Sequence, residues 1–578
     1  MYLRNVTLAL LFFPSGSIMS SLGNSVIPEN SHVFNYFFFR AHLMVFAYFP
    51  QISAYFFKIG VDKTSKKCGA TRPSLKSIFF SEVPLMLKHW QTHAEYQQFI
   101  SDAVALLNPS QLKKLHSMSD SWNKLTSMNL DPVGDFLAPF YSATGRPALN
   151  QPQILRSFIL MLDRKFTSLT NWVCELQGDD LLAMLIGCSP DHLPPLGSYF
   201  DFINRLWLRN PDFEKSGRND LFPADKNRKP SSKPGNGKKL PNRHSGITKT
   251  VADFALSERE FPFYYEKALQ QLFSIAAIVP SLELGLIDSD NLTVSGDGTC
   301  VHSHANPYGH KVCKCSENGQ YDCSCPRHFS DPDASWGWDS DLNVYYYGHT
   351  LYMFSCHNEQ YQTDLPLHIR FFDARRHDSV SGIISLSEFR QLNPDLQIKN
   401  ICLDSAHDNY PTYELCKNWN IIPFIDLNSN RGRPQSIPKR LTINTDGTPL
   451  CAAGFRMVYW GYSPKRHDCK WRCPVACGKE EKCTCEVPCS SSSYGRCLYT
   501  KPDWDIRLYT PVPRGTEEYK KTYNNRTSSE RVNNRILNDY HLHDMKIHGK
   551  KRYSFFAVIA GINIHLDARL KKSKKDAA

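Results

Sequence analysis

The sequence predicts a mixed α/β sheet domain that follows an all-helical region and is interrupted by cysteine-rich insertions. Three observations support this class: apolar residues recur at helical spacing before residue 210, strands separated by turns follow Leu286, and most of the 19 cysteines lie between Cys300 and Cys497. The chain has 578 residues, which is enough for several domains and a large core. Its 41% hydrophobic and 21% charged residues exclude an intrinsically disordered protein.

The apolar runs within residues 1–80 predict an apolar N-terminal extension of uncertain role. Residues 6–13 are an apolar run that follows an arginine and precedes small residues, which is the outline of a secretory signal. Translation from Met19, or a poorly constrained extension, explains the same pattern. A second apolar stretch, residues 41–57, is shorter than the roughly 20 residues that a spanning helix needs and contains a proline. We therefore do not expect a membrane partner.

Residues 81–213 predict a helical domain. Ile154, Leu155, Phe158 and Leu162 lie at the spacing of one helix face, and glycines 178 and 187 punctuate the pattern. The arginines and lysines of this region fit either a phosphate-binding face or an ordinary solvated face.

Residues 214–246 predict a flexible basic linker. Seven Lys or Arg and no acidic residue occur between Lys226 and Arg243, among prolines and glycines that cannot build a core. Such a segment binds a polyanion or serves only as a solubilising tether, and the net charge of +12 favours an anionic partner. The residues that we expect to contact the polyanion are Lys226, Arg228, Lys229, Lys238 and Lys239.

Residues 247–578 predict the sheet domain. We expect strands at 292–297, 345–355 and 365–372, then a strand at 398–404, a helix at 411–419 and a strand at 421–426. Helices are expected at 517–540 and, as a closing apolar helix, at 553–566. Cysteine-rich insertions are expected at about 300–340 and 430–510.

Three acids are candidate catalytic residues. Asp297 and Asp404 stand where predicted strands end, and Glu530 shares a helix face with Tyr523 and Arg526. Carboxylates on adjacent rigid elements can hold two divalent cations about 4 Å apart, as phosphoryl transfer requires, while Arg526 contacts a phosphate. Considered one at a time, Asp297 also fits a turn residue, Asp404 a helix cap, and Glu530 a surface ion-pair partner.

These motifs resemble the DDE transposases of bacterial insertion sequences. VSGDGT at Asp297 and LDSAHDNY at Asp404 are similar to the family's first two acidic motifs, and Tyr523, Arg526 and Glu530 match Y-x2-R-x3-E of its signature helix. The resemblance extends over about residues 145–568 and includes ARRHDS at 374–379. The family's next signature position is lysine, whereas position 537 here is Leu537, which leaves that phosphate contact in doubt.

The resemblance implies a ribonuclease H-like core and a DNA transposase that hydrolyses phosphodiesters at element ends and joins the 3′ ends to target DNA. It further implies two Mg²⁺ ions at Asp297, Asp404 and Glu530, for which Mn²⁺ can substitute, and a homodimer on double-stranded DNA in the bacterial cytoplasm, at the nucleoid. DNA contacts are expected from Tyr523, Arg526, Arg531 and the basic linker. The resemblance also implies that the helical domain at 81–213 binds the element ends and that the insertion at about 430–510 folds as strands. A non-catalytic zinc-containing DNA-binding protein, or a nuclease without strand transfer, is the alternative.

Two groups of cysteines predict structural zinc. Cysteines this close in sequence seldom reach disulfide geometry but readily bind one ion, and thiolates select Zn²⁺ over Mg²⁺. The first group is Cys313, Cys315, Cys323 and Cys325, with His302, His304 or His310 as alternative ligands. The second group, whose ligands the spacing cannot partition, is Cys469, Cys473, Cys477, Cys483, Cys485, Cys489 and Cys497. Unligated cysteines in a reducing compartment remain the alternative.

Overall fold

A computed structural model describes residues 85–87, 89–208, 246–325, 327–339, 342–428, 437–438, 441–482, 484 and 489–577. The predicted extension, the basic linker and two cysteines lie outside these described residues. They include Lys226, Arg228, Lys229, Lys238, Lys239, Cys483 and Cys485. In the described part of the chain, no helix combines the length and the apolar character that crossing a membrane requires.

Between residues 89 and 208 the described chain is mainly helical. A short parallel pair, β1 (Leu85–Leu87) and β2 (Arg146–Ala148), accompanies the helices. The helices are α4 (His93–Ala105), α5 (Pro109–His116), α6 (Ser119–Ser127), α7 (Asp131–Leu137), α8 (Gln151–Asp163), α9 (Leu169–Gly178), α10 (Asp180–Ile186) and α11 (Leu196–Arg205). Residues 151–162 of α8 are all buried, so this helix lies inside the core rather than on its surface.

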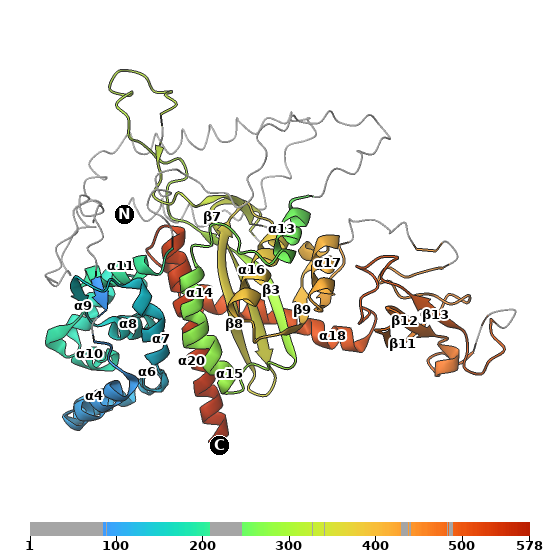
Figure 1. Ribbon diagram of the computed structural model, residues 1–578, viewed down its shortest axis with the longest axis horizontal. Helices are drawn as coiled ribbons and strands as arrows, with labels where there is room; N and C mark the ends of the chain where they lie inside the picture. Colours follow the sequence, from blue (N-terminus) through green and yellow to red (C-terminus); the bar gives the residue numbers. More distant parts are fainter. Residues whose placement is uncertain are drawn as a thin grey trace, which may run out of the picture. The chain divides into compact units, whose positions relative to one another are not determined.

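The central sheet has the strand order β10-β9-β3-β7-β8, with β6 beside one end of β7. Its strands are β3 (Leu292–His302), β6 (Ser335–Asp339), β7 (Val344–Asn358), β8 (Thr363–Asp373), β9 (Ile398–Leu403) and β10 (Ile422–Ile425). Strands β3, β7 and β8 pair antiparallel, whereas β9 and β10 run parallel to β3. The predicted mixed sheet is therefore confirmed (Figure 1).

Helices cover both faces of the sheet. They are α13 (Ile247–Leu256), α14 (Lys267–Phe273), α15 (Val279–Glu283), α16 (Asp378–Leu392), α17 (Tyr410–Asn418), α18 (Glu517–Tyr523), α19 (Thr527–Asn534) and α20 (Lys550–Asp576). Ser528 of α19 hydrogen-bonds Ser355 of β7 on one face, and Gly382 of α16 packs against Tyr352 of β7 on the other. Helix α20 contacts α14 and β8, and Figure 1 shows α14 and α20 side by side.

Two predicted elements differ from those observed. Strand β3 continues to His302, because β7 is long enough to pair with it as far as Gly348, so Asp297 lies within the strand and not at its end. The helix expected at 517–540 is divided: α18 is followed by a 3₁₀ turn at Asn524–Arg526, α19, and a π-helical turn at Arg535–Asp539.

The helical region and the sheet share one hydrophobic core. Phe158 of α8 packs edge-on against Phe555 of α20 at a ring-centroid distance of 4.6 Å, and the Asn563 amide donates to the Ile159 carbonyl. Helix α20 is buried on all sides from Tyr553 to Leu566. The predicted boundary near residue 213 therefore separates two parts of one compact unit.

The second insertion forms a small antiparallel sheet, as predicted. Its strands are β11 (Val458–Ser463), β12 (Asp468–Arg472) and β13 (Cys497–Thr500). One face of β12 is buried in its own apolar cluster with Met457. Within the first insertion, the described residues between β3 and β6 form one two-residue pair, β4 (His310–Lys311) and β5 (Arg327–His328).

Candidate functional site

Asp297 and Asp404 meet at one end of the sheet. Strands β3 and β9 are adjacent and parallel, with Ser295 opposite Cys402, so two further residues along each strand bring the two acids side by side. Asp404 directly follows β9 and caps the next turn, accepting a hydrogen bond of 3.2 Å from the Ala406 N–H. The sequence prediction that these two acids converge agrees with this register.

The pKa values of the two carboxylates shift in opposite directions from the ordinary value. Burial raises the pKa of Asp297 to about 7, and the negative charges of Asp404 and Asp378 add to this effect. Burial acts to raise the pKa of Asp404, but the hydrogen bonds from His407 and the Ala406 N–H, together with the charges of His407 and Arg526, outweigh burial, so the pKa of Asp404 lies below its ordinary value. The site therefore concentrates negative charge that a bound cation would relieve.

His407 holds Asp404 in place. Its Nδ1 donates to Asp404 Oδ1 at 2.6 Å, and its Nε2 lies 2.9 Å from the Tyr352 hydroxyl. The imidazole is buried, and a Cβ atom at Gly382 would come within 3.0 Å of its Nε2. Burial favours neutral histidine, yet the hydrogen bond to Asp404 and the surrounding acids raise the pKa of His407 above its ordinary value.

Glu530 reaches this site through an arginine. Its carboxylate forms an ion pair of 2.7 Å with Arg526. The positive charge of Arg526 favours ionised Asp404 and Asp297, and for Asp297 it partly counteracts the rise in pKa that burial causes. No direct hydrogen bond or ion pair joins Glu530 to either aspartate within the described residues. The structure thus brings Asp297 and Asp404 together and places Arg526 between them and Glu530.

The remaining side chains of the signature helix have structural partners. Tyr523 stacks on Tyr519 and donates a hydrogen bond of 2.7 Å to Asp426, which follows β10. Arg531 forms a two-pronged pair with Asp364 of β8 at 2.6 and 2.7 Å. These contacts fasten α18 and α19 to the sheet, and the DNA contacts of Tyr523 and Arg531 stay predictions.

The buried position of Leu537 explains why the signature lysine is absent from this chain. It is 6% exposed and belongs to the main hydrophobic core, on the π-helical turn after α19. A lysine there would place its charge among apolar side chains, which is costly. The nearby Arg535 is itself paired with Asp567 at 2.5 Å.

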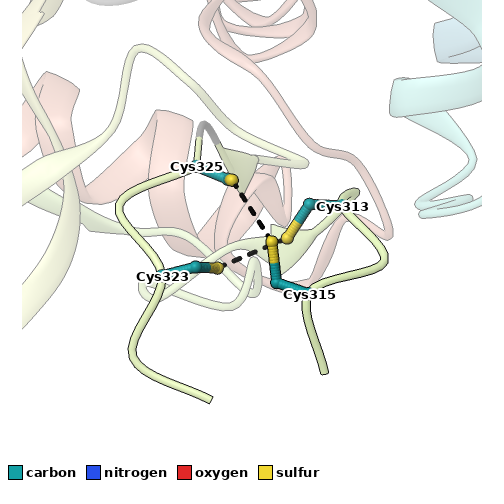
Figure 2. A group of neighbouring side chains, drawn as sticks. All are labelled: Cys313, Cys315, Cys323 and Cys325. Atoms are coloured by element: carbon teal, nitrogen blue, oxygen red, sulfur yellow. Dashed lines mark hydrogen bonds between the residues drawn. The ribbon is translucent and has the colours of Figure 1, made fainter. Parts of the chain in front are cut away.

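The first cysteine group forms a compact cluster. The sulfur atoms of Cys313, Cys315, Cys323 and Cys325 all lie within 4.8 Å of one another, which could hold one metal ion (Figure 2). Cys313 lies 3.4 Å from Cys323, and Cys315 lies 3.6 Å from Cys325. These separations exceed a disulfide bond and are close to the roughly 3.8 Å between ligands of a tetrahedral site with 2.3 Å metal–sulfur bonds. Within the described residues, this is the one such group of three or more His, Cys, Asp or Glu.

The second cysteine group is only partly described. Cys469 is buried beside Met457 and Trp471, its thiol donates to the Thr510 carbonyl, and burial raises its pKa to about 12. It is therefore a core residue of this small sheet, and its assignment as a zinc ligand stays a prediction. The backbones of Cys473 and Cys477 share a turn, and Cys473 also bonds the residue before Cys497. Cys489 is described but belongs to no cluster of ligand atoms.

Sequence reasoning missed three side chains near the acids. They are Asp378, His407 and Asn533. His407 follows Asp404 by three residues and Asp378 lies in ARRHDS, so both were present in the motifs that carry the resemblance. Asn533 follows Glu530 by one helical turn, and its amide approaches Asp297 at 3.4 Å. A search for polar residues one turn beyond each acid would have found His407 and Asn533.

No protein-family model matches this chain, and no curated protein matches it.

Proposed function

We propose that this chain is a DNA transposase whose metal-dependent centre lies at Asp297 and Asp404. The observation that carries the proposal is the convergence of these two carboxylates from adjacent parallel strands, with Arg526 and Glu530 beside them. The reaction is phosphodiester hydrolysis at element ends, followed by attack of the freed 3′ hydroxyl on target DNA. Both steps are in-line displacements with different nucleophiles, so one centre serves both.

The order of the strands supports a ribonuclease H-like core. Three antiparallel strands are followed by two strands parallel to the first, and the first strand carries Asp297 at the centre of the sheet. The helix after the fifth strand brings Arg526 and Glu530 to the same end. This arrangement is the one that the sequence resemblance implies for such transposases.

The donor set suits Mg²⁺. Asp297, Asp404 and Glu530 offer oxygen atoms only, which are the ligands of hard divalent cations, and a bound cation would offset the mutual repulsion of Asp297, Asp404 and Asp378. When bound, two Mg²⁺ ions would activate the attacking oxygen and stabilise the leaving oxygen. Three carboxylates that share two ions need not lie as close to one another as the four cysteines that would bind a single ion. Arg526 is placed to contact a phosphate beside the acids, and His407 fixes the orientation of Asp404.

A nicking assay tests the proposed function. The substrate is a supercoiled plasmid that carries the DNA flanking the gene, incubated with Mg²⁺ or with a chelator. We expect nicks with 3′ hydroxyl ends and joined products with wild type in Mg²⁺, and neither with the chelator or with Asp297→Asn. The control is Asp290→Asn, an exposed acid just before β3, which should keep full activity. Equal nicking by Asp297→Asn and wild type would overturn the proposal, and nicks without joined products would favour a nuclease.

We also propose that the first cysteine cluster holds structural Zn²⁺. The Cys313 thiol is preset for deprotonation, because the backbone N–H of Cys315 and the Cys323 thiol lower its pKa to about 7. The ion would fasten the loop between β3 and β6, where the described residues form one two-residue strand pair. Four thiolates leave no open position, so this ion is structural rather than catalytic.

Elemental analysis of the reduced protein checks the zinc proposal. Replacing Cys315 and Cys323 by serine is expected to lower the zinc content by about one ion per chain, since a tetrahedral site loses half its ligands. Cys416→Ala removes a buried cysteine of α17 outside both groups and should leave the content unchanged. Equal zinc in wild type and the double variant would contradict the assignment.

The proposal extends to partners and location. Two element ends must be cut and joined together, so a homodimer on double-stranded DNA is expected, in the bacterial cytoplasm at the nucleoid. Size-exclusion chromatography with end DNA reports the stoichiometry of that complex.

A further inference from the structure

We propose that Asp378 and Asn533 are further oxygen contacts of the divalent-cation site at Asp297 and Asp404. The inference rests on the proposed function and adds two residues that approach the site from opposite faces of the sheet. Asp378 opens α16, and Asn533 lies near the end of α19.

Asp378 lies directly against the strand that carries Asp297. A Cβ atom at Gly298, the next residue of β3, would overlap the Asp378 carboxylate, so the present position of that carboxylate depends on the glycine. The carboxylates of Asp378, Asp404 and Asp297 influence one another's ionisation. Three acids therefore share one end of the sheet.

Asp378 has no compensating donor. Its carboxylate accepts no hydrogen bond and joins no ion pair among the described residues, although the residue is half-buried. The charged groups that act on it are His407 on the turn after β9, Asp404, and His377 directly before α16, and the hydroxyl-bearing rings of Tyr352 and Tyr346 also face it. A half-buried carboxylate beside two others lacks the paired cation or metal ion that usually accompanies such a group.

Asn533 supplies the second, independent observation. Its side chain is 5% exposed, and its Nδ2 donates to Asp297 Oδ2 at 3.4 Å. Its carbonyl oxygen, on the same amide, is buried without any hydrogen-bond partner. Amide and carbonyl ends exchange by rotation about one bond, and a side-chain carbonyl is a ligand that hard divalent cations take. After that rotation the carbonyl oxygen of Asn533 faces Asp297, where it would be available to a cation.

Mn²⁺ binding tests the inference without DNA. Free Mn²⁺ is measured by electron paramagnetic resonance as purified full-length protein is titrated, and the Mn²⁺-induced rise in melting temperature is recorded in parallel. We expect Asp378→Asn to weaken Mn²⁺ binding by about tenfold or more, and Asn533→Leu, which keeps the side-chain shape, by a smaller factor. Each variant should keep a cooperative melting transition.

Matched controls separate a cation contact from a packing role. Asp180→Asn removes the acid that opens α10, and Asn563→Leu removes another buried asparagine with an orphaned carbonyl, in α20. Both should bind Mn²⁺ as wild type does. Wild-type affinity in Asp378→Asn and Asn533→Leu, or no Mn²⁺ binding by wild type, would overturn the inference. Mn²⁺ binding that needs Asp378 in a protein that never cleaves DNA would support the inference and overturn the proposed function.

Discussion

Asp404→Asn is expected to lower the rate of Mg²⁺-dependent nicking by about 10³-fold or more. Asp404 is the acid whose pKa is held low, so it supplies a full negative charge at neutral pH. Metal ions contribute several kcal/mol to the stabilisation of a displacement transition state, and about 4 kcal/mol corresponds to 10³-fold in rate. Asparagine keeps the size and one oxygen but removes the charge. Initial rates of plasmid nicking at saturating Mg²⁺ measure the loss.

An exposed aspartate provides the comparison for this variant. Asp395 lies in the turn between α16 and β9, on the chain just before the strand that leads to Asp404. Asp395→Asn changes the net charge equally and should nick at the wild-type rate. A rate for Asp404→Asn within tenfold of that control would show that the carboxylate is dispensable for cleavage.

Arg370→Met is expected to destabilise the fold by about 3–5 kcal/mol. Arg370 of β8 is fully buried between two buried glutamates: it pairs with Glu266 and donates to Glu388 at 3.0 and 3.3 Å. Its positive charge offsets the burial of Glu266, whose pKa stays below the ordinary value. Removing one member of a buried charge network leaves an uncompensated charge, which accounts for the size of the effect. Urea denaturation followed by tryptophan fluorescence measures it.

Two further variants isolate the buried charge as the cause. Arg164→Met removes an exposed arginine after α8 that forms no ion pair within the described residues, and should change stability by less than about 0.5 kcal/mol. Combining Arg370→Met with Glu266→Gln and Glu388→Gln removes all three charges and should recover part of the loss. If the single and triple variants unfold at the same urea concentration, uncompensated charge is not the reason.

The sheet was predictable because its signals are local. Strand-forming runs around Leu351 and Ile369 alternate or are continuously apolar, and Ile401 precedes an acid and a turn, so strand positions follow from the sequence. The full length of β3 was not predictable, since it depends on pairing with residues 348–355 of β7, which no local pattern encodes. The position of α8 and α20 in one core also depends on contacts between segments some 400 residues apart, such as Asn563 with Ile159.

The site was predictable where chain order alone places a residue. Asp404 follows a strand directly, and its neighbour His407 lies within one turn of it. Arg531 carries the positive charge that a phosphate contact needs, yet it forms an ion pair with Asp364 of β8. Asp378 is separated from Asp297 by 81 positions, and only the packing of α16 against Gly298 brings them together. Contacts of this kind can be identified only from the tertiary structure. The sequence does not show which residues from distant elements will lie beside a given charged side chain.

The position of α20 has a consequence for biosynthesis. All strands of the central sheet precede this helix in the chain, yet it covers β8 and fills the core beside α8. On the ribosome, the apolar surface of those strands therefore emerges before its cover has been translated. Nascent chains should need chaperone protection during that interval, and gene copies interrupted upstream of Lys550 should yield products that aggregate or are degraded.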